Sequence, residues 1–202
     1  GGAGGGISTL RNNIHYLKPD FCVLTETRIA DRNAKLKTTF RGHVGRQHSS
    51  SGERAKGVII FAKKGLEIEP NSVYNNEQGY FTVAVYHIEG SRVIVAGVYG
   101  PPDSLDRQAG QVYDNFFDKI AEYTITYSTK SIIIGGDWNL QIYNPRAKKR
   151  TCESVRNWLE ELSLEDKEGE EKRTLDDNNN TRDRCKRSCC YIKSRRSVTS
   201  RL

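Results

Sequence analysis

Lys18-Pro19-Asp20-Phe21-Cys22-Val23-Leu24-Thr25-Glu26-Thr27 and Ile132-Ile133-Ile134-Gly135-Gly136-Asp137-Trp138-Asn139 are the two stretches that decide the fold of this chain. Each is a short apolar run that ends in acidic or amide side chains. Such a run is typical of a buried strand, and α/β folds carry their active sites at the carboxyl ends of strands. Carboxylate and amide oxygens at such an edge suit Mg²⁺ and phosphate. The pair therefore predicts a metal-dependent phosphoesterase.

The rest of the chain supplies further strands and helices around these two segments. Strands are predicted at 58–61, 80–88 and 92–98, and the alternation within 80–88 predicts a strand with one less buried face. Helices are predicted at 7–17, 112–123 and 155–162, where apolar residues recur at helical spacing. This order predicts an α/β fold of two packed sheets covered by helices.

Length and charge narrow the class of protein. The 202 residues suffice for one domain with a sizeable core, and the net charge is +7. No run of about 18 apolar residues occurs, so no membrane-spanning helix is expected.

A basic tract at residues 182–202 holds eight Arg and Lys residues and one Asp. Its net charge of +7 equals the net charge of the whole chain. It either contacts nucleic-acid phosphates or is a solvated end. It shows no apolar periodicity, so it is expected to lie outside the core, although it could instead be a disrupted strand of the sheet. The residues proposed to bind nucleic acid are Arg182, Arg184, Lys186, Arg187, Lys193, Arg195 and Arg196.

The cysteines fall into two groups with different expected roles. Cys22 lies in an apolar run and is expected in the core. Cys185, Cys189 and Cys190 lie far from every histidine in the sequence, so a zinc site is a weaker interpretation than reduced thiols in a reducing compartment.

Four residues are candidates for the reactive site. Glu26 ends a strand and either holds a divalent cation or is a solvated acid. Asp137 could orient or activate a water and Asn139 could donate to a phosphate oxygen, unless the two form a plain Gly-Asp turn. Tyr99 either presents its phenol to a phosphate or packs in the core. The joint pattern favours the functional interpretation over each alternative.

Three motifs make the chain resemble the endonuclease/exonuclease/phosphatase superfamily. Residues 17–27 resemble the motif that carries the family's metal-binding Glu, and Gly97-Val98-Tyr99-Gly100-Pro101-Pro102 resembles its tyrosine–proline motif. Gly136-Asp137-Trp138-Asn139 resembles its Gly-Asp-aromatic-Asn motif. The Leu-Thr-Glu-Thr sequence and the Lys56-Gly57-Val58 segment look most like those of the endonuclease domain of LINE-type (non-LTR) retrotransposons.

The resemblance implies a four-layered α/β sandwich, in which two packed mixed sheets are flanked by helices. It implies Mg²⁺- or Mn²⁺-dependent hydrolysis of a phosphodiester, here nicking of DNA. Glu26 would bind the metal, Tyr99 would contact a phosphate, Asp137 would position or activate the water, and Asn139 would stabilise the transition state. The partners expected from the resemblance are DNA and a fused reverse transcriptase. The protein is expected to be a monomer that is located in the nucleus and the cytoplasm.

The chain departs from the family pattern at both ends. The family begins with a strand that ends in a metal-site Asn, and it ends with a Ser-Asp-His motif that supplies the general base. None of His15, His43, His48 and His87 stands at the matching place. We therefore expect a domain over 1–165 and an incomplete C-terminal part over 166–202, both ends truncated and catalysis impaired.

Two rival functions stay open at this level. One is a phosphatase of the same fold that acts on a lipid or inositol phosphate, and the other is a non-catalytic nucleic-acid-binding remnant. The phosphodiesterase interpretation requires Glu26, Tyr99, Asp137 and Asn139 to meet in one crevice. The carboxylates of Glu26 and Asp137 should then lie within about 10 Å of each other, since one hydrated cation and one phosphate must touch both.

Overall fold

The computed structural model describes residues 12, 14–27, 43–49, 56–101, 106–140, 150–162, 164–166 and 192–194. Its smaller sheet has three strands in the order β1-β3-β2. Its larger sheet has seven strands in the order β4-β6-β7-β8-β10-β9, with β5 paired to β6. The strands of the smaller sheet are β1 (Phe21–Thr25), β2 (His43–Ser49) and β3 (Val58–Lys63). Those of the larger sheet are β4 (Glu67–Ile68), β5 (Tyr74–Asn75), β6 (Phe81–Ile88), β7 (Ser91–Tyr99), β8 (Ile132–Asp137), β9 (Leu164–Asp166) and β10 (Ile192–Ser194).

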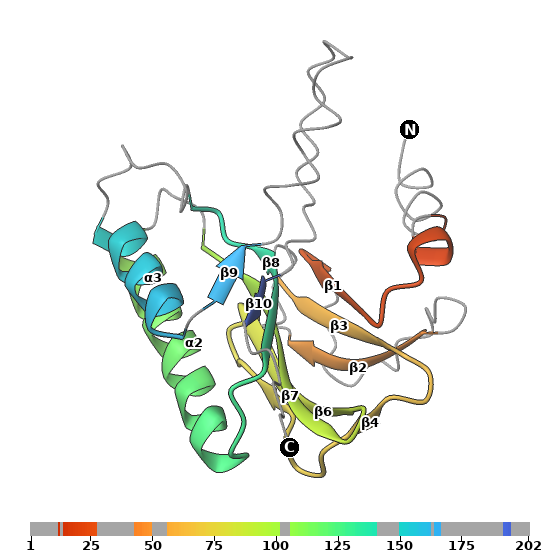
Figure 1. The fold of residues 1–202 in the computed structure, drawn as a ribbon. Helices are drawn as coiled ribbons and strands as arrows, with labels where there is room; N and C mark the ends of the chain where they lie inside the picture. The colour runs from red at the N-terminus through yellow and green to blue at the C-terminus, as the bar shows by residue number, and fades with distance from the viewer. Residues whose placement is uncertain are drawn as a thin grey trace, which may run out of the picture.

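Four layers follow one another across the molecule (Figure 1). The helices α2 (Asp106–Thr126) and α3 (Arg150–Glu161) cover one face of the larger sheet. The smaller sheet covers the opposite face, and the helical residues 14–17 lie beyond it, with Ile14 packed near Cys22 and Phe61. The predicted α/β sandwich of two mixed sheets flanked by helices is confirmed.

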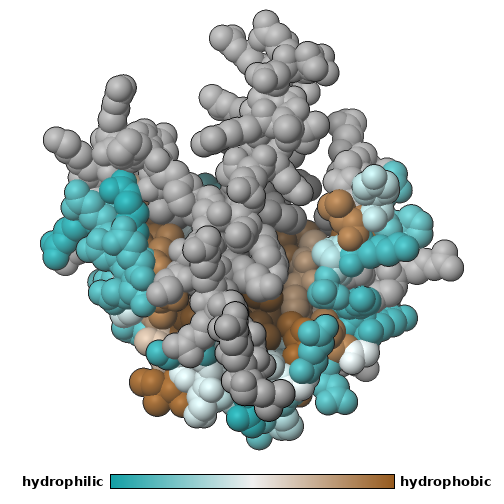
Figure 2. Space-filling view, viewed as in Figure 1, coloured by the Kyte–Doolittle hydropathy of each residue, from teal (hydrophilic) through white to brown (hydrophobic). Residues whose placement is uncertain are grey.

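The predicted apolar stripes of the two helices pack against the larger sheet in one core cluster. The stripe of α2 includes Val112, Phe116 and Ile120, which are at most 3% exposed. Val155 and Leu159 of α3 join the same cluster against the larger sheet. Figure 2 shows one face of the molecule, on which apolar residues gather between hydrophilic outer surfaces. No helix in the described part of the chain has the length and hydropathy needed to cross a membrane.

Strand β6 corrects one prediction. Alternation within 80–88 predicted one less buried face, but Thr82, Ala84 and Tyr86 are as buried as Phe81, Val83 and Val85. The reason is that both faces are covered. Val83 and Val85 face the helix side, whereas Ala84 and Tyr86 pack with Ile60 and Ala62 of β3 in the layer between the two sheets.

Strand β10 agrees with the alternative that part of the basic tract is a strand of the sheet. Ile192 and Lys193 pair antiparallel with Ile134 and Ile133 of β8, and the other edge of β10 pairs with β9. A three-residue strand carries too little pattern to be detected from alternation. Part of the tract therefore belongs to the larger sheet, next to the strand that ends in Asp137.

Strands β7 and β8 run parallel and are connected through α2, which is the crossover that a parallel pair requires. Their register places Tyr99 beside Asp137. Gly97, two residues earlier, faces the smaller sheet at close range. A Cβ atom on Gly97 would lie 2.7 Å from Cγ1 of Val58 and 3.0 Å from Cγ1 of Val23. The two sheets therefore approach each other closely at Gly97, two residues before the end of β7.

We predict that Gly97→Ala lowers the free energy of unfolding by about 1–3 kcal/mol, because the added methyl group overpacks the space between the sheets. The control is Gly110→Ala in α2, where the new Cβ would meet only Oγ1 of Thr151 at 3.9 Å. That change should raise stability by up to about 1 kcal/mol, since glycine is a poor helix former. Urea denaturation measures both, and equal effects of the two variants would contradict the close approach of the sheets.

Candidate functional site

Three strand ends bring the predicted site residues together. Tyr99 ends β7 and Asp137 ends β8, and the parallel register pairs the two residues directly. Glu26 follows β1 in the other sheet, and its Oε1 accepts a 2.8 Å hydrogen bond from the Tyr99 hydroxyl. The bond joins residues 73 positions apart in the sequence, so it fixes the two sheets against each other at this edge.

The phenol of Tyr99 is held in its neutral form. Burial is the main cause that raises its pKa to about 12, and the hydrogen bond to Glu26 and the negative charges of Glu26 and Asp137 add to it. Both carboxylates are therefore close enough to act on the same hydroxyl. At neutral pH Tyr99 is a hydrogen-bond donor between two acids and does not serve as a base.

The segment after β8 is folded back on itself by its own polar groups. The backbone N–H of Asn139 donates to Oδ1 of Asp137 at 3.0 Å. The Asn139 side chain donates from Nδ2 to the carbonyl of Gly100 at 2.8 Å, and the N–H of Gly100 donates to the carbonyl of Asp137 at 2.7 Å. Asp137 and Asn139 are thus fixed against the end of β7, beside Tyr99.

Two of the site residues have left-handed backbones. Glu26 has a φ of 52° and Asn139 a φ of 49°. Asparagine adopts this conformation readily, but for glutamate it is uncommon. Strain of this kind persists where the surrounding structure imposes it, and it clusters at functional sites. The glycine before Asp137 is also required, because a Cβ on Gly136 would lie 1.9 Å from the carbonyl oxygen of Val98.

Tyr113 of helix α2 holds the segment that follows β8 in place. The buried Tyr113 hydroxyl donates a short hydrogen bond to the carbonyl oxygen of Trp138, and the two rings are stacked. Gly100 lies against the same pair, since a Cβ there would be 1.8 Å from the Tyr113 hydroxyl oxygen. Any other residue at position 100 would displace the segment that carries Asp137 and Asn139.

An aromatic stack continues this contact into the helix layer. The ring of Trp138 also stacks on Phe117, and Phe117 stacks on Trp158 of α3 at 5.5 Å between centroids. Sequence reasoning placed Tyr113 and Phe117 only as neighbours of the apolar stripe of α2. Their role was missed because stripe periodicity identifies buried rings but does not show which strand end they touch.

The donor set suits a cation that needs few protein ligands. Glu26 is exposed and Asp137 half-buried, and Asn139 adds an amide. Among the described residues no group of three His, Cys, Asp or Glu side chains is placed to hold a metal ion. Mg²⁺ is commonly bound by one or two carboxylates with waters and substrate phosphate, so these residues fit Mg²⁺ better than a closed zinc cage.

The other predicted residues lie elsewhere. Cys22 is buried as predicted, and Lys193 lies on β10. His87 contacts Glu69 at 2.8 Å, in a group with Arg92 that does not include the four site residues. Several predicted residues lie outside the described ones, namely Arg182, Arg184, Lys186, Arg187, Arg195, Arg196, Cys185, Cys189 and Cys190.

Comparison with known proteins establishes the fold. The sequence matches no protein-family model and no protein of curated function. Solved structures do match. The endonuclease domain of TRAS1, a telomere-specific non-LTR retrotransposon, superposes with a TM-score of 0.56 at 15% identity, over 93% of this chain and 78% of that one.

Two other solved structures have the same architecture. AP endonuclease LMAP from Leishmania major gives a TM-score of 0.57 at 18% identity, over 79% of this chain and 62% of that one. TDP2 from Caenorhabditis elegans gives 0.56 at 15% identity, over 94% of this chain and 58% of that one. The chain therefore has the endonuclease/exonuclease/phosphatase fold and spans less than two thirds of these two proteins.

We predict that Tyr113→Phe lowers the free energy of unfolding by about 1–3 kcal/mol, because the buried carbonyl of Trp138 loses its donor. Tyr123→Phe is the matched control. Tyr123 is a buried tyrosine of the same helix, and it donates to the carbonyl of Ser72 at 2.9 Å, away from the site. Both variants should lose similar stability in urea denaturation. Only Tyr113→Phe should perturb the amide NMR signals of Asp137 and Asn139, and unchanged signals would contradict the proposed hold.

Proposed function

We propose that this chain is a Mg²⁺-dependent DNA endonuclease domain of the retrotransposon type. The observation that carries the proposal is the Tyr99–Glu26 hydrogen bond beside the Tyr99–Asp137 pair, because it joins the residues of all three motifs at one edge. The nuclease-type fold and the motif resemblance to LINE-type domains support it further. A phosphodiester is the substrate class that such a set of acids, amide and phenol can address.

Each side chain has a role that follows from its contacts. Asp137 has one oxygen engaged by the Asn139 backbone, so its second oxygen can orient and deprotonate an attacking water. The Asn139 amide carries two N–H donors, and one is directed at Gly100. The second can donate to a phosphoryl oxygen as charge develops on it.

Tyr99 has one hydroxyl proton and therefore one choice of acceptor. It donates to Glu26 in this structure and, when phosphate is present, can turn to a phosphate oxygen. Glu26 is the residue that would hold the cation. When bound, Mg²⁺ would polarise the phosphoryl oxygen and stabilise the leaving oxygen.

We predict that the chain nicks supercoiled plasmid DNA slowly in Mg²⁺ and that EDTA stops the reaction. The rate should be low because no histidine is among the four residues that the described structure brings together. Glu26→Gln and Asp137→Asn should each lower the rate by at least about a hundredfold. Asp118→Asn and Glu160→Gln, which change exposed acids on α2 and α3, should leave it unchanged.

Mn²⁺ binding followed by electron paramagnetic resonance gives a second readout, and Glu26→Gln should weaken it. Nicking by Asp137→Asn at the wild-type rate would remove the proposal. Hydrolysis of inositol or lipid phosphates with intact DNA would identify a phosphatase of the same fold. DNA binding without any hydrolysis would identify a non-catalytic binding remnant.

The basic tract should supply most of the non-specific DNA affinity. Because residues 192–194 form a strand of the larger sheet, the test replaces charges and leaves the chain intact. Glutamine at Arg182, Arg184, Lys186, Arg187, Arg195 and Arg196 should weaken duplex binding. It should also flatten the log–log salt dependence by about 0.9 for each phosphate that is no longer neutralised. An unchanged affinity and slope in fluorescence anisotropy would show that the tract is only a solvated end.

A further inference from the structure

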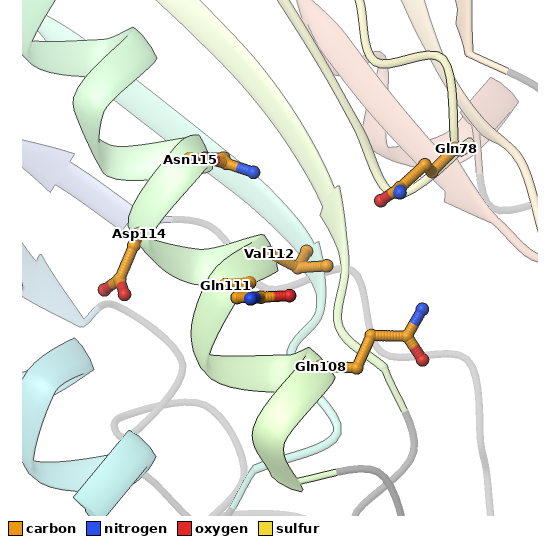
Figure 3. Close-up of a pocket in the computed structure, with 6 residues that line it drawn as sticks. All are labelled: Gln78, Gln108, Gln111, Val112, Asp114 and Asn115. Atoms are coloured by element: carbon orange, nitrogen blue, oxygen red, sulfur yellow. The ribbon is translucent and has the colours of Figure 1, made fainter.

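A polar hollow of about 380 Å³ lies between the N-terminal half of α2 and the turn that precedes β6. It is lined by Gln78, Gln108, Gln111, Val112, Asp114 and Asn115. Figure 3 shows Asn115 and Val112 directed from α2 toward the side where Gln78 lies, whereas Asp114 points away from it. Its size lies within the range of small-ligand sites in proteins.

The lining is rich in amides and carries one carboxylate, Asp114. Four of its six residues are Gln or Asn, and none is Lys or Arg. An amide both donates and accepts hydrogen bonds, so it matches groups that present both kinds of atom. A phosphate presents only acceptors and is usually met by cations or rows of N–H groups. Base edges present donors and acceptors together, and Asn and Gln side chains recognise them.

Backbone hydrogen bonds place the hollow next to the reactive site. Thr27, which follows Glu26, donates to the carbonyl of Gly57 at 3.2 Å, and Gly57 donates to the carbonyl of Gly79 at 3.2 Å. Tyr99 donates from its N–H to the carbonyl of Tyr80 at 2.7 Å. The loops that carry Glu26, Lys56 and Gln78 therefore lie side by side along one edge.

Lys56 lies between the acids and the amides on this edge. Its ammonium is 4.6 Å from the centre of the Tyr80 ring, which is buried and fixed in the core. A cation–π contact of this kind orients the ammonium over the ring face. In the described part of the chain, this edge thus presents carboxylates, then the Lys56 ammonium, then the amide-rich lining of the hollow.

We propose that this hollow binds the base of a nucleotide that flanks the cleaved phosphodiester, and that Lys56 contacts the phosphate between them. The inference rests on the proposed function, since it assigns a nucleic-acid strand to this edge. The amide pair Gln78 and Asn115 would hydrogen-bond the base edge from opposite walls. The hollow would then set which nucleotides are preferred beside the cut.

The test compares DNA strands of equal charge with and without bases. Binding is measured by fluorescence anisotropy in Ca²⁺ for a labelled duplex, a single strand of mixed sequence, and an abasic strand of the same length. The wild-type chain should bind the base-bearing strand about tenfold more tightly than the abasic strand. Gln78→Ala and Asn115→Ala should each bring that ratio toward one. Asn157→Ala, which removes an exposed asparagine of α3, should leave it unchanged.

Lys56→Ala should weaken binding of both single strands equally and lower the salt slope by about 0.7. Gln78 and Asn115 are exposed, so both variants should fold, and urea denaturation checks this. Equal binding of the two single strands by the wild-type chain, with duplex binding retained, would overturn the hollow and spare the endonuclease proposal. So would a tenfold ratio that survives in both amide variants. Failure to bind any of the three DNA probes would overturn both proposals.

Discussion

The parallel pairing of β7 with β8 is the constraint on which the site depends. It ends with Tyr99 beside Asp137, and the backbone bond from Gly100 to Asp137 continues the pairing one step past the strands. The polar groups at this edge take their positions from that ladder. Glu26 is located by the Tyr99 hydroxyl, and Asn139 by the Gly100 carbonyl. A slip of one residue in this register would separate the phenol from both acids.

The close packing around the ladder explains why the motifs contain so many glycines. Gly97 allows the two sheets to approach, Gly100 makes room for the Tyr113 hydroxyl, and Gly136 makes room for the Val98 carbonyl. These are steric requirements from three directions. The close packing that these glycines allow holds the strand ends in fixed positions. Polar groups that are held in place before a reaction stabilise a developing charge most effectively.

Much of this arrangement could be predicted from the sequence, for identifiable reasons. Apolar runs that end in Glu26 and Asp137 predicted which strand ends lie together at one edge, and helical stripes predicted the core faces of α2 and α3. Burial on both faces of β6 could not be predicted, because it depends on a second sheet that arrives from elsewhere in the chain. Whether the basic tract contributes a strand could not be decided for a different reason, since the three residues of β10 give no periodic signal.

The contacts made by Tyr113 were equally hidden in the sequence, because a hydroxyl that meets a carbonyl across layers leaves no spacing pattern. The aromatic stack that it begins has an optical consequence. The chain has two tryptophans, and both Trp138 and Trp158 stack on Phe117. The indole nitrogen of Trp138 is buried and makes no hydrogen bond to any described residue. Intrinsic tryptophan fluorescence of the folded protein therefore arises entirely from this stack, with no tryptophan elsewhere to dilute it. A shift in emission wavelength on adding DNA would report on the stack that joins the segment after β8 to α3, without any introduced label.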